Sequence, residues 1–98
     1  MDINKTKNGE TLELALVGRL DTSTAPALEE VVNAEVENTK ELIFEFKNLE
    51  YISSAGLRVL LACQKKMNAA GKMVIKNVSE DIMEVFDITG FSDILNIE

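Results

Sequence analysis

The chain has 98 residues, of which 46% are hydrophobic and 28% are charged. This size and balance suit one compact domain over residues 1–98 and are too small for two ordinary ones. The formal net charge of −7 disfavours direct binding to nucleic acid or an anionic membrane, because phosphate contacts need clustered Lys and Arg. The absence of histidine excludes Ser-His-Asp and Cys-His catalysis within the chain, and with one cysteine it argues nearly as firmly against a zinc site.

Two features of the sequence predict a soluble protein of the cytoplasm. No apolar run approaches the roughly 18 residues needed to span a bilayer. The polar segment Met1–Glu10 lacks the hydrophobic core of a signal peptide. The single cysteine, Cys63, lies in the apolar run after Leu60 and is expected to be a buried, small hydrophobic residue.

The first predicted elements are two strands joined by a turn. Asn8-Gly9 is a strong signal for a tight turn. After it, Leu12, Leu14 and Leu16 alternate with other residues, which is the period of a half-buried strand. Residues 3–7 are therefore expected to be the partner strand of a hairpin.

Helices and strands then alternate. Cap residues crowd between Asp21 and Thr24, before Pro26, and apolar residues recur at helical spacing as far as Val36. A strand follows at residues 41–47, with apolar residues on both faces. Residues 48–51 are expected to be a connection.

The second half repeats this alternation. A helix is predicted from Ser53-Ser54 to Ala70-Gly71, and a strand follows at residues 72–78. Another helix is predicted from Ser79 to Gly90. Residues 91–97 are expected to close as a short turn and a last strand.

This order of elements predicts an α/β fold with a mostly parallel sheet and right-handed crossovers. We expect four to five strands, an antiparallel N-terminal strand and about four helices. In such sheets, binding sites gather where strands end and helices begin. Asp21-Thr22 and Ser53-Ser54 both occupy such joints, so we predict that the two joints lie near one another.

The Ser53-Ser54 joint has two interpretations. Serine is a favoured helix N-cap, so the pair can serve the fold alone. A helix start also carries unpaired N–H groups and roughly half a positive charge, which suits a phosphate added to a serine there. Ala55 and Gly56 would then let the backbone of another protein come close.

Other chemistry for these serines is poorly supported. Neither serine lies in a G-x-S-x-G or S-x-x-K motif, and no histidine is present to activate a hydroxyl. Acyl carriers are also small and acidic, but they are all-helical and usually have Asp-Ser-Leu at the serine that carries the arm. The sequence therefore favours none of these chemistries for either serine.

Three separated motifs carry a resemblance to a known family. LEYISSAGLRVLL, residues 49–61, resembles the signature of anti-sigma-factor antagonists, the small STAS-domain proteins of bacteria. VGRLDTSTAPAL, residues 17–28, is similar to their Gly-x-Leu-Asp landmark before the first helix. Residues 68–95 are similar to their final part, including the late Gly-Phe. The likeness covers nearly the whole chain.

The resemblance implies a STAS fold and a partner switch. Such a protein binds an anti-sigma factor that is also a serine kinase, and binding frees a sigma factor to direct RNA polymerase. The kinase uses ATP and Mg²⁺ to phosphorylate the antagonist, which weakens the complex, and a PP2C-type phosphatase restores it. The antagonist is substrate and ligand, is not itself an enzyme, and has no cofactor or metal of its own. Separately, a single domain with polar ends is expected to be a monomer when alone.

The family motif also implies site residues. Ser54 aligns with the phosphoacceptor serine, and Ser53 stands where the family has Asp, which leaves it as a rival acceptor. Arg58 stands where glycine is common, and either pairs with a phosphate or a partner's carboxylate or lies on a solvated helix face. Asp21 matches the Asp of the first landmark, and serves either in partner binding or as a helix cap. The predicted partner-binding residues are Asp21, Thr22, Ser53, Ala55, Gly56, Leu57 and Arg58.

One alternative remains within the same family. Similar domains serve as plain interaction subunits of lipid-transport assemblies and signalling complexes, without a phosphorylation cycle. The missing Asp at position 53 keeps this alternative open.

Overall fold

The computed structural model describes residues 1–98 and contains one four-stranded sheet in the order β1-β2-β3-β4. Strand β1 is antiparallel to β2, and the other neighbouring pairs are parallel, as predicted. The strands are β1 Asp2–Asn8, β2 Thr11–Leu20, β3 Glu41–Ile52 and β4 Lys72–Lys76.

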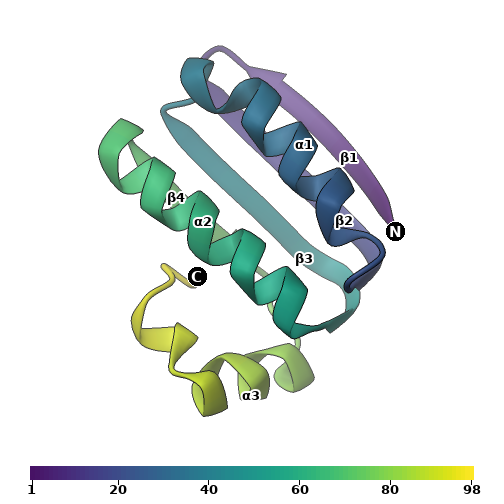
Figure 1. The fold of residues 1–98 in the computed structure, drawn as a ribbon. Coiled ribbons are helices and arrows are strands. Elements are labelled where there is room, and N and C mark those ends of the chain that lie inside the picture. The colour runs from purple at the N-terminus through teal and green to yellow at the C-terminus, as the bar shows by residue number, and fades with distance from the viewer.

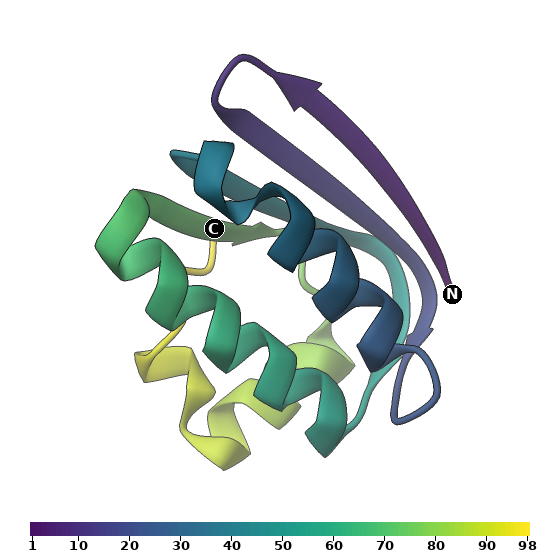
Figure 2. The same ribbon diagram turned by 45° about the horizontal axis from the view of Figure 1, so that its top comes forward.

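Helices α1 and α2 lie side by side over one face of this sheet, and α3 lies beyond α2, on the side away from α1 (Figures 1 and 2). The bounds are α1 Ala25–Glu35, α2 Ser54–Ala70 and α3 Glu80–Thr89. There are thus three α-helices where about four were expected, because Val36–Asn38 and Phe91–Asp93 form only short 3₁₀ turns. The expected last strand is reduced to one bridge, from Ile97 to Ile75. None of the helices has both the length and the apolar character needed to cross a membrane.

The core lies between the sheet and the helices. Leu12, Leu14 and Leu16 of β2 are almost fully buried there, as their alternation predicted. On β3, Phe44 and Phe46 meet edge to face with ring centroids 5.9 Å apart. Burying each such side chain is worth about 1.5–3 kcal/mol, so this layer supplies much of the stability of the fold.

Strand β3 is longer than predicted. Residues 48–51, expected to be a connection, continue the strand to Ile52. The pairing with β2 shifts register twice, between Ala15 and Val17 and again between Gly18 and Arg19. Such bulges let β3 carry extra residues while Leu20 and Ile52 still meet as partners at the end of the sheet.

Local signals explain the helix ends. The Ser79 Oγ accepts a 3.3 Å hydrogen bond from the backbone N–H of Ile82, which caps α3 as predicted. Gly90 ends α3 with φ +82°, a conformation that glycine adopts without strain. Gly71 is the C-cap residue of α2, and glycine is needed there for a steric reason, because a Cβ would lie 1.8 Å from the carbonyl oxygen of Lys40.

Candidate functional site

The two strand-to-helix joints lie next to each other, as the sequence predicted. The backbone N–H of Ser53 donates a 2.9 Å hydrogen bond to the carbonyl of Leu20. Because β2 and β3 are parallel, the loop that precedes α1 and the first turn of α2 leave the sheet at the same edge. This edge therefore brings Thr22 close to the start of α2.

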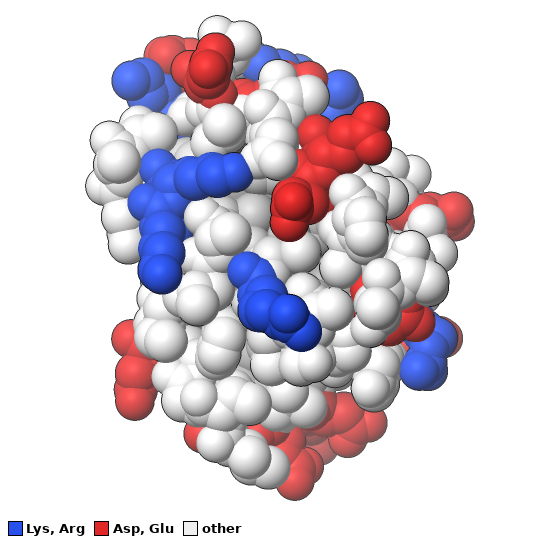
Figure 3. Space-filling view, viewed as in Figure 1, with Lys and Arg blue, Asp and Glu red and all other residues white.

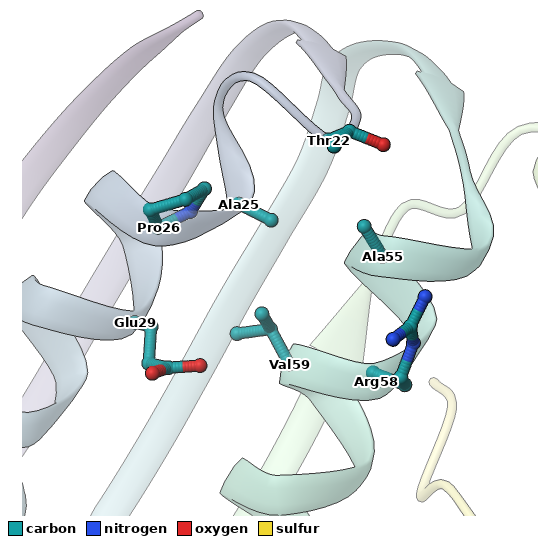
Figure 4. A pocket seen from close by; sticks show the side chains of 7 residues that line it. All are labelled: Thr22, Ala25, Pro26, Glu29, Ala55, Arg58 and Val59. Carbon is teal, nitrogen blue, oxygen red and sulfur yellow. The ribbon is translucent and has the colours of Figure 1, made fainter.

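A shallow groove of about 270 Å³ runs between the starts of α1 and α2. Thr22, Ala25, Pro26 and Glu29 line it from one side, and Ala55, Arg58 and Val59 line it from the other. Figure 4 shows the carboxylate of Glu29 reaching from α1 toward Val59, and the guanidinium of Arg58 turned along α2 toward Ala55. The groove is thus apolar at its floor, with one carboxylate and one guanidinium at its rim.

Four of the groove residues were missed by the sequence reasoning, namely Ala25, Pro26, Glu29 and Val59. Their spacing contained the signal, because residues three or four positions apart lie on the same helix face. Glu29 follows Pro26 by three positions and Val59 follows Ala55 by four, so each pair can line one groove.

The two serines of the joint differ in access. Ser54 is the first residue of α2 and is exposed. Ser53 stands at the N-cap position with an extended backbone, but its side chain makes no capping bond. Its Oγ is buried and has no hydrogen-bond partner. Ser53 therefore occupies the N-cap position of α2 without the side-chain hydrogen bond that the capping interpretation predicted.

Gly56 and Leu57 also require a correction. Both are buried, so neither offers a surface on which another backbone could lie. A Cβ at position 56 would come within 2.7 Å of Leu20 Cγ and 2.8 Å of Ile52 Cγ1. Glycine at this position lets α2 approach the ends of β2 and β3, and Leu57 packs in the core.

Asp21 organises the loop before α1. Its Oδ1 accepts from the backbone N–H of Ser23 at 3.0 Å, from Ser23 Oγ at 2.8 Å and from the backbone N–H of Thr24 at 3.2 Å. The Ser23 hydroxyl, with these N–H groups, holds the pKa of Asp21 below its ordinary value, although partial desolvation opposes the effect. The N-cap residue of α1 is Thr24, so Asp21 shapes the loop without being the cap.

The surface around the groove is sparsely charged. In Figure 3, Lys and Arg side chains lie over the middle and the C-terminal part of α2, while much of the area over α3 is uncharged and bordered by acidic side chains. Arg58 is exposed, four positions after Ser54, so both residues lie on the same side of the helix. A negative group on Ser54 would therefore have the guanidinium of Arg58 one helical turn away.

The comparisons with known proteins agree with this fold. Residues 2–98 match the family described as the STAS domain, and the chain belongs to that family. It is 30% identical over 99 residues to the anti-sigma-B factor antagonist of Staphylococcus aureus (strain NCTC 8325 / PS 47), covering 99% of this chain and 92% of the relative. It is 29% identical over 98 residues to the anti-sigma-B factor antagonist of Bacillus subtilis (strain 168), covering 99% and 90%. The resemblance drawn from the three motifs is confirmed.

Solved structures share the architecture. The anti-sigma factor antagonist SpoIIAA in its unphosphorylated form aligns with a TM-score of 0.80 at 19% identity, over 99% of this chain and 87% of that one. The Bacillus cell fate determinant SpoIIAA in the phosphorylated form aligns with a TM-score of 0.79 at 20% identity, over 99% and 91%. At 19–20% identity, this likeness shows a shared fold alone.

Proposed function

We propose that this chain is a cytoplasmic anti-sigma factor antagonist that is switched by phosphorylation of Ser54. It is the ligand and the substrate in the cycle, and it is not the enzyme. An anti-sigma factor with serine kinase activity would bind the edge formed by the two joints and release its sigma factor. A PP2C-type phosphatase would remove the phosphate from Ser54 and restore binding.

The observation that carries this proposal is the contrast between the two serines. Ser54 is exposed at the start of α2, where a kinase can reach its hydroxyl. The Oγ of Ser53 is buried without a partner, and a phosphate there would place about two negative charges in a desolvated position. The contrast favours Ser54 as the acceptor.

The physics of the helix end explains why the fold would tolerate the phosphate. The first N–H groups of a helix have no partner within the helix, and the dipole favours negative charge there. Arg58, four positions further on, would supply a cation for a charge-assisted bond. The modification would therefore alter the binding surface without unfolding the domain.

The same position explains how the phosphate would weaken a complex. A partner lying against Thr22, Ala55 and Arg58 would cover the start of α2. A phosphate of about −1.5 to −2 charges on Ser54 would have to be desolvated under that partner. In addition, Arg58 would be drawn to the phosphate and would be lost as a contact for the partner.

The proposal is tested by comparing the binding of a variant that cannot be phosphorylated, Ser54→Ala, with that of a variant that carries a negative charge, Ser54→Asp. The anti-sigma factor kinase of the same cells, expressed and purified, should bind Ser54→Ala as tightly as the wild type and bind Ser54→Asp at least about tenfold more weakly. Ser53→Ala is the matched control and should bind like the wild type. Equal affinity of Ser54→Ala and Ser54→Asp would contradict the switch.

The alternative of an unmodified interaction subunit rests on Ser53. The family's Asp would place a carboxylate beside the acceptor, whereas Ser53 supplies only a buried hydroxyl. If this alternative holds, the wild type should co-purify with subunits of a transport or signalling complex, and Ser54→Asp should not disturb that association.

A further inference from the structure

We infer that Arg19 and Tyr51 form a second contact for the anti-sigma factor, on the sheet face opposite the helices. The inference rests on the proposed function. It adds a surface that lies outside the groove, and neither residue is among the partner-binding residues that the family motif implies. The partner chemistry that this surface suits is an acidic side chain flanked by an apolar one.

Arg19 and Tyr51 form one stacked pair. They are direct partners in the register of β2 and β3. The guanidinium carbon of Arg19 lies over the ring of Tyr51, 4.2 Å from its centroid. Such a cation–π contact between exposed side chains is worth about 0.5–1 kcal/mol, enough to favour one geometry before any partner arrives.

A bulge makes this pairing possible. Gly18 pairs with Leu49, and the next residue, Arg19, pairs with Tyr51, so Glu50 is skipped. Without the shift, Arg19 would face Glu50, and the ring of Tyr51 would have no cation beside it. Bulges of this kind re-aim side chains and are frequent beside functional sites.

Two contacts with the loop before α1 hold Arg19 in place. Thr24 Oγ1 donates a 2.8 Å hydrogen bond to the carbonyl of Arg19, which ties this residue to the loop before α1. Asp21 Oδ2 lies 3.8 Å from Arg19 Nε, near enough to orient the guanidinium but too far for a hydrogen bond. Most of the N–H donors of Arg19 are therefore open to an incoming carboxylate.

The pair is open to solvent and close to the switch. The side chain of Arg19 is 59% exposed, and Tyr51 is 41% exposed, one of three large hydrophobic residues that are exposed on this protein. The next residues, Leu20 and Ile52, are buried in the core under the helices, so alternation directs Arg19 and Tyr51 to the other face.

The path to the switch is short. Leu20, which follows Arg19, accepts the hydrogen bond from the backbone N–H of Ser53. A partner that covers Ser54 at the edge of the sheet can therefore reach the Arg19–Tyr51 pair by extending around that edge. Tyr and Arg are among the residues most enriched at the positions that carry most of the binding energy of interfaces, and a pre-ordered pair loses little side-chain entropy on binding.

Affinity measurements on the unphosphorylated protein test the inference. With the purified anti-sigma factor kinase of the same cells, Arg19→Ala and Tyr51→Ala should each weaken binding about tenfold. Tyr51→Phe keeps the ring and should bind within about twofold of the wild type. Arg19→Lys keeps the positive charge but loses the planar stack on Tyr51. Its affinity should fall between that of Arg19→Ala and that of Tyr51→Phe.

Two controls separate this contact from folding and from net charge. Each variant should keep the melting temperature of the wild type to within a few degrees. Lys40→Ala removes one positive charge at the opposite end of β3 and should leave affinity unchanged. If Arg19→Ala and Tyr51→Ala bind within twofold of the wild type, or if Lys40→Ala weakens binding equally, the inference is wrong. If the wild type itself fails to bind the kinase, it is the proposed function that fails.

Discussion

The backbone N–H of Ser53 donates to the carbonyl of Leu20, and this one bond joins the start of α2 to the end of β2. It places the serine joint beside the loop shaped by Asp21. Any change in how α2 packs on the ends of β2 and β3 would therefore move Ser54, the proposed acceptor, relative to Thr22 and the groove.

Gly56→Ala should destabilise the protein. The new Cβ would lie within 2.8 Å of atoms of both Leu20 and Ile52, so α2 would have to shift away from the strand ends. The expected loss is about 1–3 kcal/mol, reduced by alanine's higher helix propensity. Urea denaturation measures it, and a variant as stable as the wild type would show that the helix start has room to move.

Asp21→Asn and Asp21→Ala should distinguish the role of Asp21 as a hydrogen-bond acceptor in the loop from the role of its negative charge. Asparagine keeps an oxygen acceptor for the Ser23 and Thr24 donors, whereas alanine removes it. We expect Asp21→Ala to lower the melting temperature by several degrees and Asp21→Asn to lower it much less. If Asp21→Asn keeps its stability yet loses affinity for the anti-sigma factor, the carboxylate contacts the partner directly.

Glu35 should make stability depend on pH. Lys5 and Lys7 of β1 each donate to its carboxylate at 2.9 Å, and these bonds hold the pKa of Glu35 below its ordinary value. A lowered pKa in the folded state means that the stabilisation is present above the unfolded-state pKa of Glu35 and is lost as the pH falls through the folded-state value.

The matching experiment compares the wild type with Glu35→Gln. At pH 7 the variant should melt at a lower temperature, and the difference should disappear once the pH falls below the lowered, folded-state pKa of Glu35. Added salt should also reduce it, since the side chains of Lys5 and Lys7 are partly exposed. A difference that persists unchanged in acid would point to packing of the side chain as its cause.

Cys63 should react only when the protein opens. Burial, above all, raises the pKa of its thiol to about 11, so almost no thiolate is present near neutral pH. At pH 8 a disulfide reagent such as DTNB should label the native protein far more slowly than the protein in urea. Labelling at equal rates would mean that α2 separates readily from the core.

Some features followed directly from local signals in the sequence. Leu12, Leu14 and Leu16 revealed their strand by alternation, and Ser79 and Gly90 marked the two ends of α3. These signals act within a few residues of chain. The order of the elements also predicted that the two joints lie next to each other, because the ends of adjacent parallel strands share one edge of a sheet.

Other features depended on contacts between distant segments. Whether Gly56 faces solvent or the core is decided by how closely α2 packs on Leu20, which no local pattern records. The Arg19–Tyr51 pair requires the register shift between β2 and β3, and the extension of β3 to Ile52 requires β2 beside it. In the same way, serine is a residue type that favours the N-cap position, but the packing of the joint buries the hydroxyl of Ser53.

The most direct test of the central claim is peptide mapping of the wild-type protein after incubation with the purified anti-sigma factor kinase, ATP and Mg²⁺. The switch predicts one phosphate per chain, located on Ser54, with Ser53→Ala modified equally and Ser54→Ala not modified. Phosphate on Ser53, or no phosphate on the wild type, would contradict the assignment of Ser54 as the acceptor.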